Sequence, residues 1–238
     1  MPTRTRTLQA QAPSWLAALL TEHEKTWIGP VAMATYKASR RYVGGFLGTC
    51  EVKPQMSAAT RRAATDHPAW STVKTLRVHG GVSDSHALTF PLQACMRGLR
   101  RLEGAFPSDF IVLATRKPPL AIDHLVLDFQ YTNELDLIAA EHAAVGTAPG
   151  LPCLVDLSIP RLCNPKLLPF LKGLAWASRI ERLHRGAAGD VDVETWIWAL
   201  RSLEIEVATV ILGDEKTAVT LARDGAGRWS RQATARQT

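Results

Sequence analysis

The sequence predicts an α/β repeat fold, in which short parallel strands stack in sequence with helical segments on their outer side and a distinct cap at each end. Three observations predict it: a short apolar pattern recurs along the 238 residues, segments of helical periodicity lie between its copies, and both ends depart from the pattern. We expect a cap region over 1–70, about six repeats over 71–214, and a hairpin cap with a tail over 215–238.

The recurring pattern is apolar-x-x-apolar-x-apolar. Its copies are Val73-x-x-Leu76-x-Val78, Leu99-x-x-Leu102, Ile122-x-x-Leu125-x-Leu127, Leu154-x-x-Leu157-x-Ile159, Ile180-x-x-Leu183 and Val207-x-x-Val210-x-Leu212. Their first positions lie 26, 23, 32, 26 and 27 residues apart, mostly within the range of about 20–29 residues that leucine-rich repeats span. The second and fifth copies are weaker, because Gly104 and Arg185 occupy their third apolar position.

The spacing inside each copy has a physical reason. The last two apolar positions alternate with a polar one, so both point to the same side of a short strand. One such apolar face is too small to be buried alone, and stacking the units joins the faces into a continuous core. The pattern therefore predicts a leucine-rich-repeat-like solenoid. The alternative is a non-repetitive α/β domain whose periodicity is accidental.

Helical segments separate the copies. They cover 91–96, 135–144, 167–174 and 193–200. In the last of these, Val193, Trp196, Ile197 and Leu200 follow the i, i+3, i+4, i+7 spacing of one helical face. Strand and helix thus alternate, which is typical of a parallel sheet with helices outside it.

The N-terminal cap is expected to be α/β. Ser14 can cap a helix that runs to about Lys25, and the segment 27–30 breaks this helix with Gly and Pro. A strand or hairpin is expected over 42–52, around a Gly-Gly pair, and a second short helix over 57–65.

The C-terminal cap is expected to be a β-hairpin. Two segments rich in strand-forming residues, 218–221 and 228–234, flank the turn sequence Asp-Gly-Ala-Gly at 224–227. Such a hairpin would cover the open end of the sheet.

Three motifs strengthen this reading. They are Leu19-Leu20 leading to Trp27-Ile28-Gly29-Pro30, then Tyr42-Val43-Gly44-Gly45-Phe46-Leu47, and His67-Pro68-Ala69-Trp70 ahead of the first repeat. The chain resembles, in these motifs, bacterial leucine-rich-repeat-like proteins that often begin with a short repeat-companion domain. The similarity spans roughly Leu16 to Trp229, and the companion domain itself is expected to be absent, since only about 15 residues precede it. The resemblance implies an interaction module of unknown partner, without catalytic residues.

The side chains between the apolar strand positions should face the concave side of the sheet. This expected interaction face consists of Arg77, His79, Glu103, His124, Asp128, Asp156, Ser158, Arg182, His184 and Thr209. Its mixed charge suits a protein partner better than a phosphate backbone, which would require repeated Lys and Arg. We therefore expect a non-enzymatic protein–protein interaction scaffold; a merely solvated face is the alternative.

Nucleic-acid binding through the N-terminal cap is the alternative function. The net charge is +6 overall, but +5 of it lies in residues 1–70. Two arginine pairs in this region, Arg40-Arg41 and Arg61-Arg62, are the candidate phosphate contacts.

Searches for catalytic and metal motifs fail. The acidic run at 190–194 resembles the start of a calcium loop, but Thr195 and Arg201 stand where that loop requires Gly and Glu. The segment 80–86 contains Ser, Asp and His but lacks the G-x-S-x-G of a nucleophile elbow. We expect no catalytic, cofactor-binding or metal-binding residues.

The cysteines and the hydropathy of the sequence indicate the cellular compartment. Cys153 and Cys163 could form a disulfide, but nothing in the spacing of the four cysteines demands one, and free thiols of a reducing compartment are expected. No run of about 18 apolar residues is present. We therefore expect a cytoplasmic protein with no membrane partner.

Overall fold

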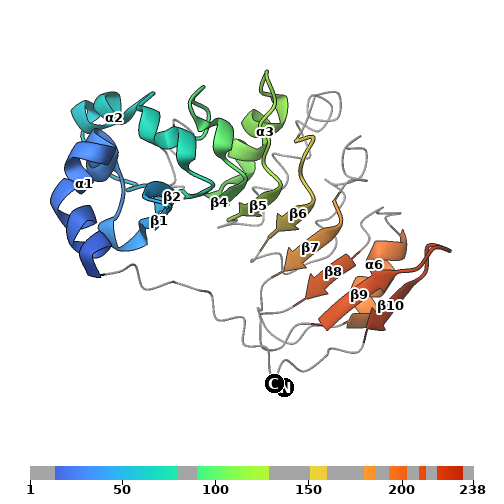
Figure 1. The fold of residues 1–238 in the computed structure, drawn as a ribbon. Coiled ribbons are helices and arrows are strands. Elements are labelled where there is room, and N and C mark those ends of the chain that lie inside the picture. Colours follow the sequence, from blue (N-terminus) through green and yellow to red (C-terminus); the bar gives the residue numbers. More distant parts are fainter. Residues whose placement is uncertain are drawn as a thin grey trace.

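The computed structural model describes residues 14–79, 90–128, 151–159, 180–185, 193–202, 209–212 and 219–232. Within these residues the chain is a mixed α/β protein with one ten-stranded sheet. The strands follow one another in the sheet in the order of the sequence, so β1 and β10 form its two open edges. Figure 1 shows the strands in succession along an arc, with α2 and α3 on its outer side.

The strands are β1 Arg41–Val43, β2 Phe46–Glu51, β3 Thr75–Arg77, β4 Arg101–Ala105, β5 His124–Leu127, β6 Asp156–Ser158, β7 Arg182–Arg185, β8 Thr209–Leu212, β9 Val219–Arg223 and β10 Trp229–Gln232. The α-helices are α1 Ser14–Ala34, α2 Ala58–Ala64, α3 Pro107–Thr115 and α6 Val193–Ser202. Three 3-10 helices are η1 Lys37–Ser39, η2 Pro68–Thr72 and η3 Met96–Gly98.

Pairing differs between the middle and the ends of the sheet. Strands β2 to β8 pair in parallel, as the alternation of strand and helix predicts. The first pair, β1 with β2, is antiparallel. At the other end β8 pairs with β9, and β9 with β10, also antiparallel. The parallel sheet is therefore confirmed, and it is bounded by an antiparallel hairpin at each end.

One apolar position is held in register across the sheet. The residues in register are Cys50, Leu76, Leu102, Leu125, Leu157, Leu183, Val210 and Leu221. Each is at most 1% exposed. From β3 to β8 these residues are the middle apolar positions of the six sequence copies, so the pattern and the strand register coincide. They form a buried row along the core, and we call it the apolar row.

The core lies between the apolar row and the segments that cover it. Trp70 of η2 is fully buried, its indole Nε1 donates to the Ala64 carbonyl at 2.7 Å, and its ring lies 4.9 Å from that of Phe90. Burial of two large aromatic rings over the first strands anchors the N-terminal part of this core. At the other end Trp196 and Leu200 of α6 are buried, as the helical spacing in the sequence predicts.

Gly104 explains why the second copy of the pattern lacks its third apolar residue. Its φ is +79°, and a Cβ there would lie 2.0 Å from the Val78 carbonyl oxygen. The register shifts at this point, so that Ala105 rather than residue 104 pairs with Leu127. Ala105 is fully buried. The β4 strand therefore carries a bulge, and Ala105 takes the apolar position that residue 104 holds in the pattern.

The N-terminal elements match their sequence predictions except for the length of the first helix. In α1 the backbone departs from helical geometry at Gly29, with φ +45° and ψ −129°, so the expected break is a kink and a second helical piece reaches Ala34. A hairpin forms over β1 and β2, turning at Gly44 and Gly45. The side chain of Ser57 accepts the N–H of Thr60 and caps α2.

The segments between the strands match in part. The predicted hairpin at the C-terminus is confirmed as β9 and β10, and α6 covers the predicted helix at 193–200. Residues 91–95 form turns that lead into η3, within the expectation of a helix or a helical turn there, and α3 was not predicted. The helices predicted over 135–144 and 167–174 lie outside the described residues. None of the described helices is both long and apolar enough to cross a bilayer.

Candidate interaction surface

The side of the sheet opposite the apolar row presents two rows of side chains, one residue before and one residue after each buried position. We call this side the strand face. The residues before are Thr49, Thr75, Arg101, His124, Asp156, Arg182 and Thr209. The residues after are Glu51, Arg77, Glu103, Val126, Ser158 and Ile211, and residue 184 has the corresponding backbone position in β7. Because strand residues alternate between faces, each row runs across the strands at right angles to the chain.

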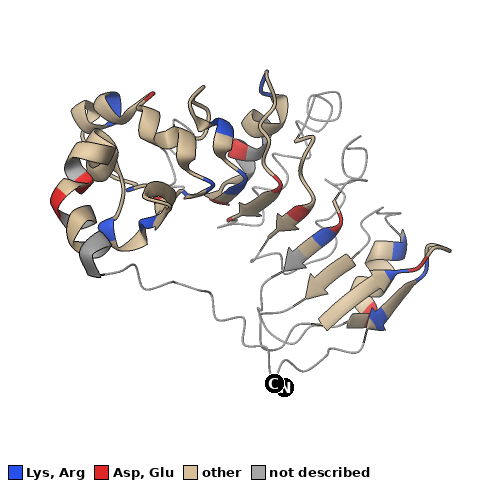
Figure 2. Cartoon of the chain, viewed as in Figure 1, with Lys and Arg blue, Asp and Glu red and all other residues tan. Residues whose placement is uncertain are grey.

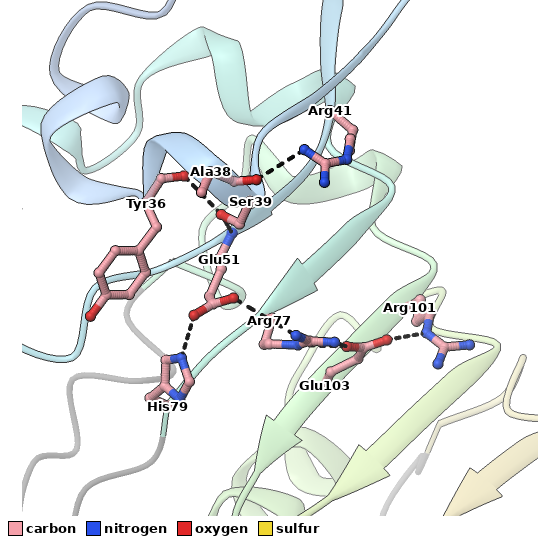
Figure 3. Close-up of polar contacts among 9 residues, drawn as sticks. All are labelled: Tyr36, Ala38, Ser39, Arg41, Glu51, Arg77, His79, Arg101 and Glu103. Carbon is pink, nitrogen blue, oxygen red and sulfur yellow. Dashed lines mark hydrogen bonds and ion pairs between the residues drawn. The ribbon is translucent and has the colours of Figure 1, made fainter. Parts of the chain in front are cut away.

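Charged side chains at the β2–β4 end of the strand face contact one another in sequence (Figure 3). Arg77 donates to Glu103 at 2.8 Å from Nε and lies 2.6 Å from it through Nη2. The same guanidinium lies 3.8 Å from Glu51. Arg101 donates to the other oxygen of Glu103 at 2.5 Å. Glu103 is thus held between two arginines from neighbouring strands.

The same sequence of contacts continues over β5 to β7. Arg101 Nη1 lies 3.2 Å from His124 Nδ1. His124 in turn lies 3.4 Å from Asp156, and Arg182 Nη2 lies 3.1 Å from the same carboxylate oxygen. The result is a continuous row of polar contacts from β2 to β7, which we call the charged row: Glu51, Arg77, Glu103, Arg101, His124, Asp156 and Arg182.

The charged row balances its own charge. It contains three carboxylates and three arginines, and His124 stands between Arg101 and Asp156. Figure 2 shows the same mixing of Lys and Arg with Asp and Glu along the described strands. The carboxylates of the row are 7–20% exposed, whereas Arg77 and Arg182 are about half exposed. The row therefore fixes a pattern of alternating charge at the surface of the strand face.

Glu103 shows the electrostatic consequence of this arrangement. Partial burial acts to raise the pKa of its carboxyl, but hydrogen bonds and charge from Arg101 and Arg77 outweigh burial and lower the pKa below its ordinary value. Glu103 is consequently ionised at neutral pH and stays bonded to both arginines.

A hollow of about 520 Å³ lies at the N-terminal end of the strand face. It is bordered by Tyr36, Arg41, Glu51, Arg77 and Glu103, among others. The Tyr36 ring meets the His79 ring edge-on, at 6.3 Å between centroids. The Arg41 guanidinium donates to the carbonyls of Ala38 and Arg40, and it has no carboxylate partner among the described residues. The hollow is open, and charged side chains stand at its border.

Most of the predicted face is brought together. Arg77, Glu103, His124, Asp156 and Arg182 belong to the charged row. His79 follows β3, and its Nε2 lies 2.6 Å from Glu51. Ser158 and Thr209 lie on the strand face beside the row, by their register. Asp128 lies just beyond β5, and its backbone N–H donates to the Ala105 carbonyl at 2.8 Å. His184 is in β7, and its side chain lies outside the described residues.

Two members of the charged row, Glu51 and Arg101, were not predicted. A signal for both exists in the sequence. Arg101 directly precedes Leu102, as His124 precedes Leu125 in the next copy. Cys50 precedes Leu76 by 26 residues, which is also the distance from Leu76 to Leu102. Extending the period one step toward the N-terminus would have placed Glu51 beside a buried position of the sheet.

Arg40 differs from the other arginines named as phosphate contacts. Its side chain is 5% exposed and lies 2.9 Å from Glu24. It also donates to Thr35 Oγ1 at 2.9 Å and to the carbonyls of Ala32 and Thr35. This guanidinium is therefore enclosed by the fold and cannot reach a phosphate. Arg41 and Arg62 are exposed, and Arg61 is half-buried.

Metal and thiol chemistry can be tested in the described part of the chain. Its His, Cys, Asp and Glu residues nowhere gather into a group of three able to hold a metal ion. Cys50, Cys95 and Cys153 are free thiols. Burial raises the pKa of Cys50 to about 12, which leaves this thiol protonated and unreactive at neutral pH. Cys163, and the segments 80–86 and 190–192 weighed for catalysis and calcium, lie outside the described residues.

No family model, no curated protein and no solved structure matches this chain.

Proposed function

We propose that this chain is a non-enzymatic protein-interaction scaffold, built as a leucine-rich-repeat-like solenoid, which binds another protein on its strand face. The observation that carries the proposal is the charged row. Seven side chains from six adjacent strands alternate in charge and hold one another in place by contacts of 2.5–3.8 Å. Fixed charges of alternating sign favour a partner with the complementary pattern and disfavour others.

The solenoid part of the proposal has its own support. The buried positions of the sequence copies coincide with the apolar row, and strand order follows sequence order. Each described strand thus pairs with its neighbours in sequence, as in repeat proteins. The strand spacing of 26 residues from Cys50 to Leu76 and from Leu76 to Leu102 agrees with leucine-rich repeats.

A cytoplasmic location belongs to the same proposal. Its support is the three free thiols, one of them exposed at Cys153. Exposed free cysteine is typical of a compartment that keeps thiols reduced.

Affinity capture with charge-reversed variants tests the interaction. The face variant carries Arg77→Glu and Arg182→Glu. The control carries Arg62→Glu on α2 and Arg97→Glu on η3, which changes the net charge equally but lies off the strand face. Quantitative mass spectrometry of proteins retained from a lysate of the source cells should show partners that the wild type and the control retain and the face variant loses. Thermal unfolding of both variants verifies the fold.

Equal retention by the face variant and the control would contradict the proposal. So would a set of retained proteins that changes only with total charge. Binding of nucleic acid through the N-terminal region, the second candidate, rests on Arg41, Arg61 and Arg62 now that Arg40 is enclosed. A gel shift on duplex DNA and on RNA, repeated at rising salt, tests it: affinity that falls steeply with salt and is weakened by Arg41→Gln supports it.

A further inference from the structure

We propose that the N-terminal end of the molecule carries a second docking site, an apolar groove that binds an apolar segment with acidic flanks from another protein. The groove has a volume of about 500 Å³ and lies apart from the charged row. Its three walls are Trp27 and Ile28 of α1, the β1–β2 turn with Phe46, and the η2 segment from Pro68 to Thr72. We call it the N-terminal groove.

Apolar side chains make up most of the lining of the N-terminal groove. Its two hydroxyls are already used within the protein: Ser71 Oγ donates to the Pro68 carbonyl at 2.7 Å, and Thr72 Oγ1 donates to the Leu47 carbonyl at 2.9 Å. No Lys, Arg, Asp or Glu is among the residues that line it. An occupant is therefore held by apolar contact inside the groove, and not by charge.

The walls are fixed to one another, so the groove is preformed. A Cβ on Gly29 would lie 3.1 Å from the His67 ring, which shows how closely the α1 kink sits against the start of η2. The bond from Thr72 to the Leu47 carbonyl ties η2 to the β1–β2 hairpin. Trp27 stacks on His23 at 5.7 Å between ring centroids. A preformed site loses less conformational entropy on binding than a site that must be assembled.

Exposed apolar side chains are concentrated in the N-terminal part of the described chain, and two of them line the groove. Eight large apolar residues of the described chain are exposed, and six lie between residues 19 and 46: Leu19, Trp27, Met33, Tyr36, Val43 and Phe46. Trp27 and Phe46 stand in the groove walls with 42% and 65% of their surfaces exposed. Apolar surface gathered in one place is typical of interaction sites, whereas single exposed apolar residues need no explanation.

Charge selects the occupant. The described segment 14–79 contains nine Lys and Arg against four Asp and Glu, whereas residues 80–238 contain seventeen against eighteen. Lys74 is exposed, and its backbone N–H donates to the Gly48 carbonyl beside the groove residue Leu47. A segment with acidic flanks is attracted to this end, whereas a second copy of the chain would bring the same positive charge.

A pair of designed peptides tests the site. One peptide carries Leu and Phe between glutamates, and the other has lysines in place of the glutamates. Affinities are measured by fluorescence anisotropy for the wild type, for Phe46→Ser and for Trp198→Ser. Trp198 is the matched control, because it is 62% exposed but belongs to α6. Loss of a central aromatic contact commonly costs about tenfold or more in affinity.

The glutamate peptide should bind the wild type and Trp198→Ser with equal affinity. Its affinity for Phe46→Ser should be about tenfold or more lower. The lysine peptide should bind the wild type about tenfold or more weakly than the glutamate peptide does. The single variant Arg182→Glu, which removes a contact of the charged row but leaves the charge of segment 14–79 unchanged, should bind the glutamate peptide like the wild type, so this test and that of the strand face fail independently. Thermal unfolding verifies that Phe46→Ser folds, as expected for an exposed side chain.

Several outcomes would overturn the inference. Equal weakening by Trp198→Ser, or equal binding of the lysine peptide, would mean unspecific adhesion. No binding of the glutamate peptide to the wild type would remove the site. A dimer seen by sedimentation and abolished by Phe46→Ser would assign the groove to a second copy. Binding to vesicles of anionic lipid in place of the peptide would assign it to a membrane surface.

Discussion

The strand face and the N-terminal groove differ in whether their exposed groups have partners within the protein. On the strand face every charge of the charged row meets an opposite charge or a histidine on a neighbouring strand. At the N-terminal end, apolar side chains are exposed and the cations outnumber the anions. A surface whose charges are already paired can select a partner mainly through its arrangement of charge. A surface with exposed apolar side chains gains free energy when a partner covers them.

Replacing Arg40 should have the largest effect on stability. Arg40 is an exception at the N-terminal end, because its charge is enclosed and paired with Glu24. Arg40→Met leaves Glu24 enclosed without its cation, and breaking a buried pair typically costs about 3–5 kcal/mol. Urea unfolding measures the change in the free energy of unfolding. The neighbour Arg41 is exposed and bonded only to carbonyls, so Arg41→Met should stay within about 0.5 kcal/mol of wild type. Equal losses would refute the contrast.

Alanine substitutions at two glycines test how closely the backbone of each region is packed. Gly104 and Gly44 both have positive φ, but a Cβ on Gly104 would meet the Val78 carbonyl at 2.0 Å, and one on Gly44 meets nothing within 4 Å. Gly44→Ala should therefore cost only the conformational strain, about 1 kcal/mol, and Gly104→Ala about 2–3 kcal/mol or more. Thermal unfolding ranks the two variants, and the reverse order would show that the bulge in β4 relaxes easily.

The smallest expected effect on stability is its pH dependence, which tests the contribution of Glu103 in the charged row. The pKa of Glu103 is lowered in the folded protein, so its ionised form contributes stability at neutral pH. This share is complete above the ordinary value of 4.5 and is lost as the pH falls through the lowered value. The variant Glu103→Gln should lose stability at neutral pH and show a shallower decline below pH 4.5, followed by urea unfolding at several pH values.

Asp109 provides an internal control of opposite sign. Burial raises the pKa of its carboxyl, and the hydrogen bond from the Phe106 N–H only partly offsets burial. Its folded form therefore holds the proton more tightly than the unfolded chain, so its contribution is most favourable at low pH and declines as pH rises through the raised value. Asp109→Asn should thus remove a trend opposite to that of Glu103. Parallel pH trends for the two variants would contradict the assignment.

The sequence predicts the sheet better than it predicts the charged row. The spacing of apolar residues indicates which strand positions are buried, so the middle positions from Leu76 to Val210 appear in the structure as the apolar row. Polar positions carry no such record, because a strand tolerates many side chains toward solvent. Glu51 was missed for this reason, and Arg40 was misjudged because its enclosure depends on Glu24, sixteen residues earlier in the chain.

Local backbone geometry was the other limit. The Gly104 position reads as a defect in the pattern, and only the close approach of the Val78 carbonyl shows that it is a bulge. Likewise Gly29 was expected to end a helix, whereas the chain bends there and continues to Ala34. Sequence identifies where a glycine interrupts a pattern, but the neighbour that requires the glycine comes from elsewhere in the fold.

The order of the strands has a consequence for how the chain acquires its shape. Every strand of the described residues pairs with the described strand just before or after it in the sequence. Joining strands that are neighbours in the sequence costs less entropy than joining remote segments. Ordering can therefore begin at one pair of strands and spread in both directions. A ribosome releasing the chain would expose a complete edge after each new strand, ready for the next to arrive.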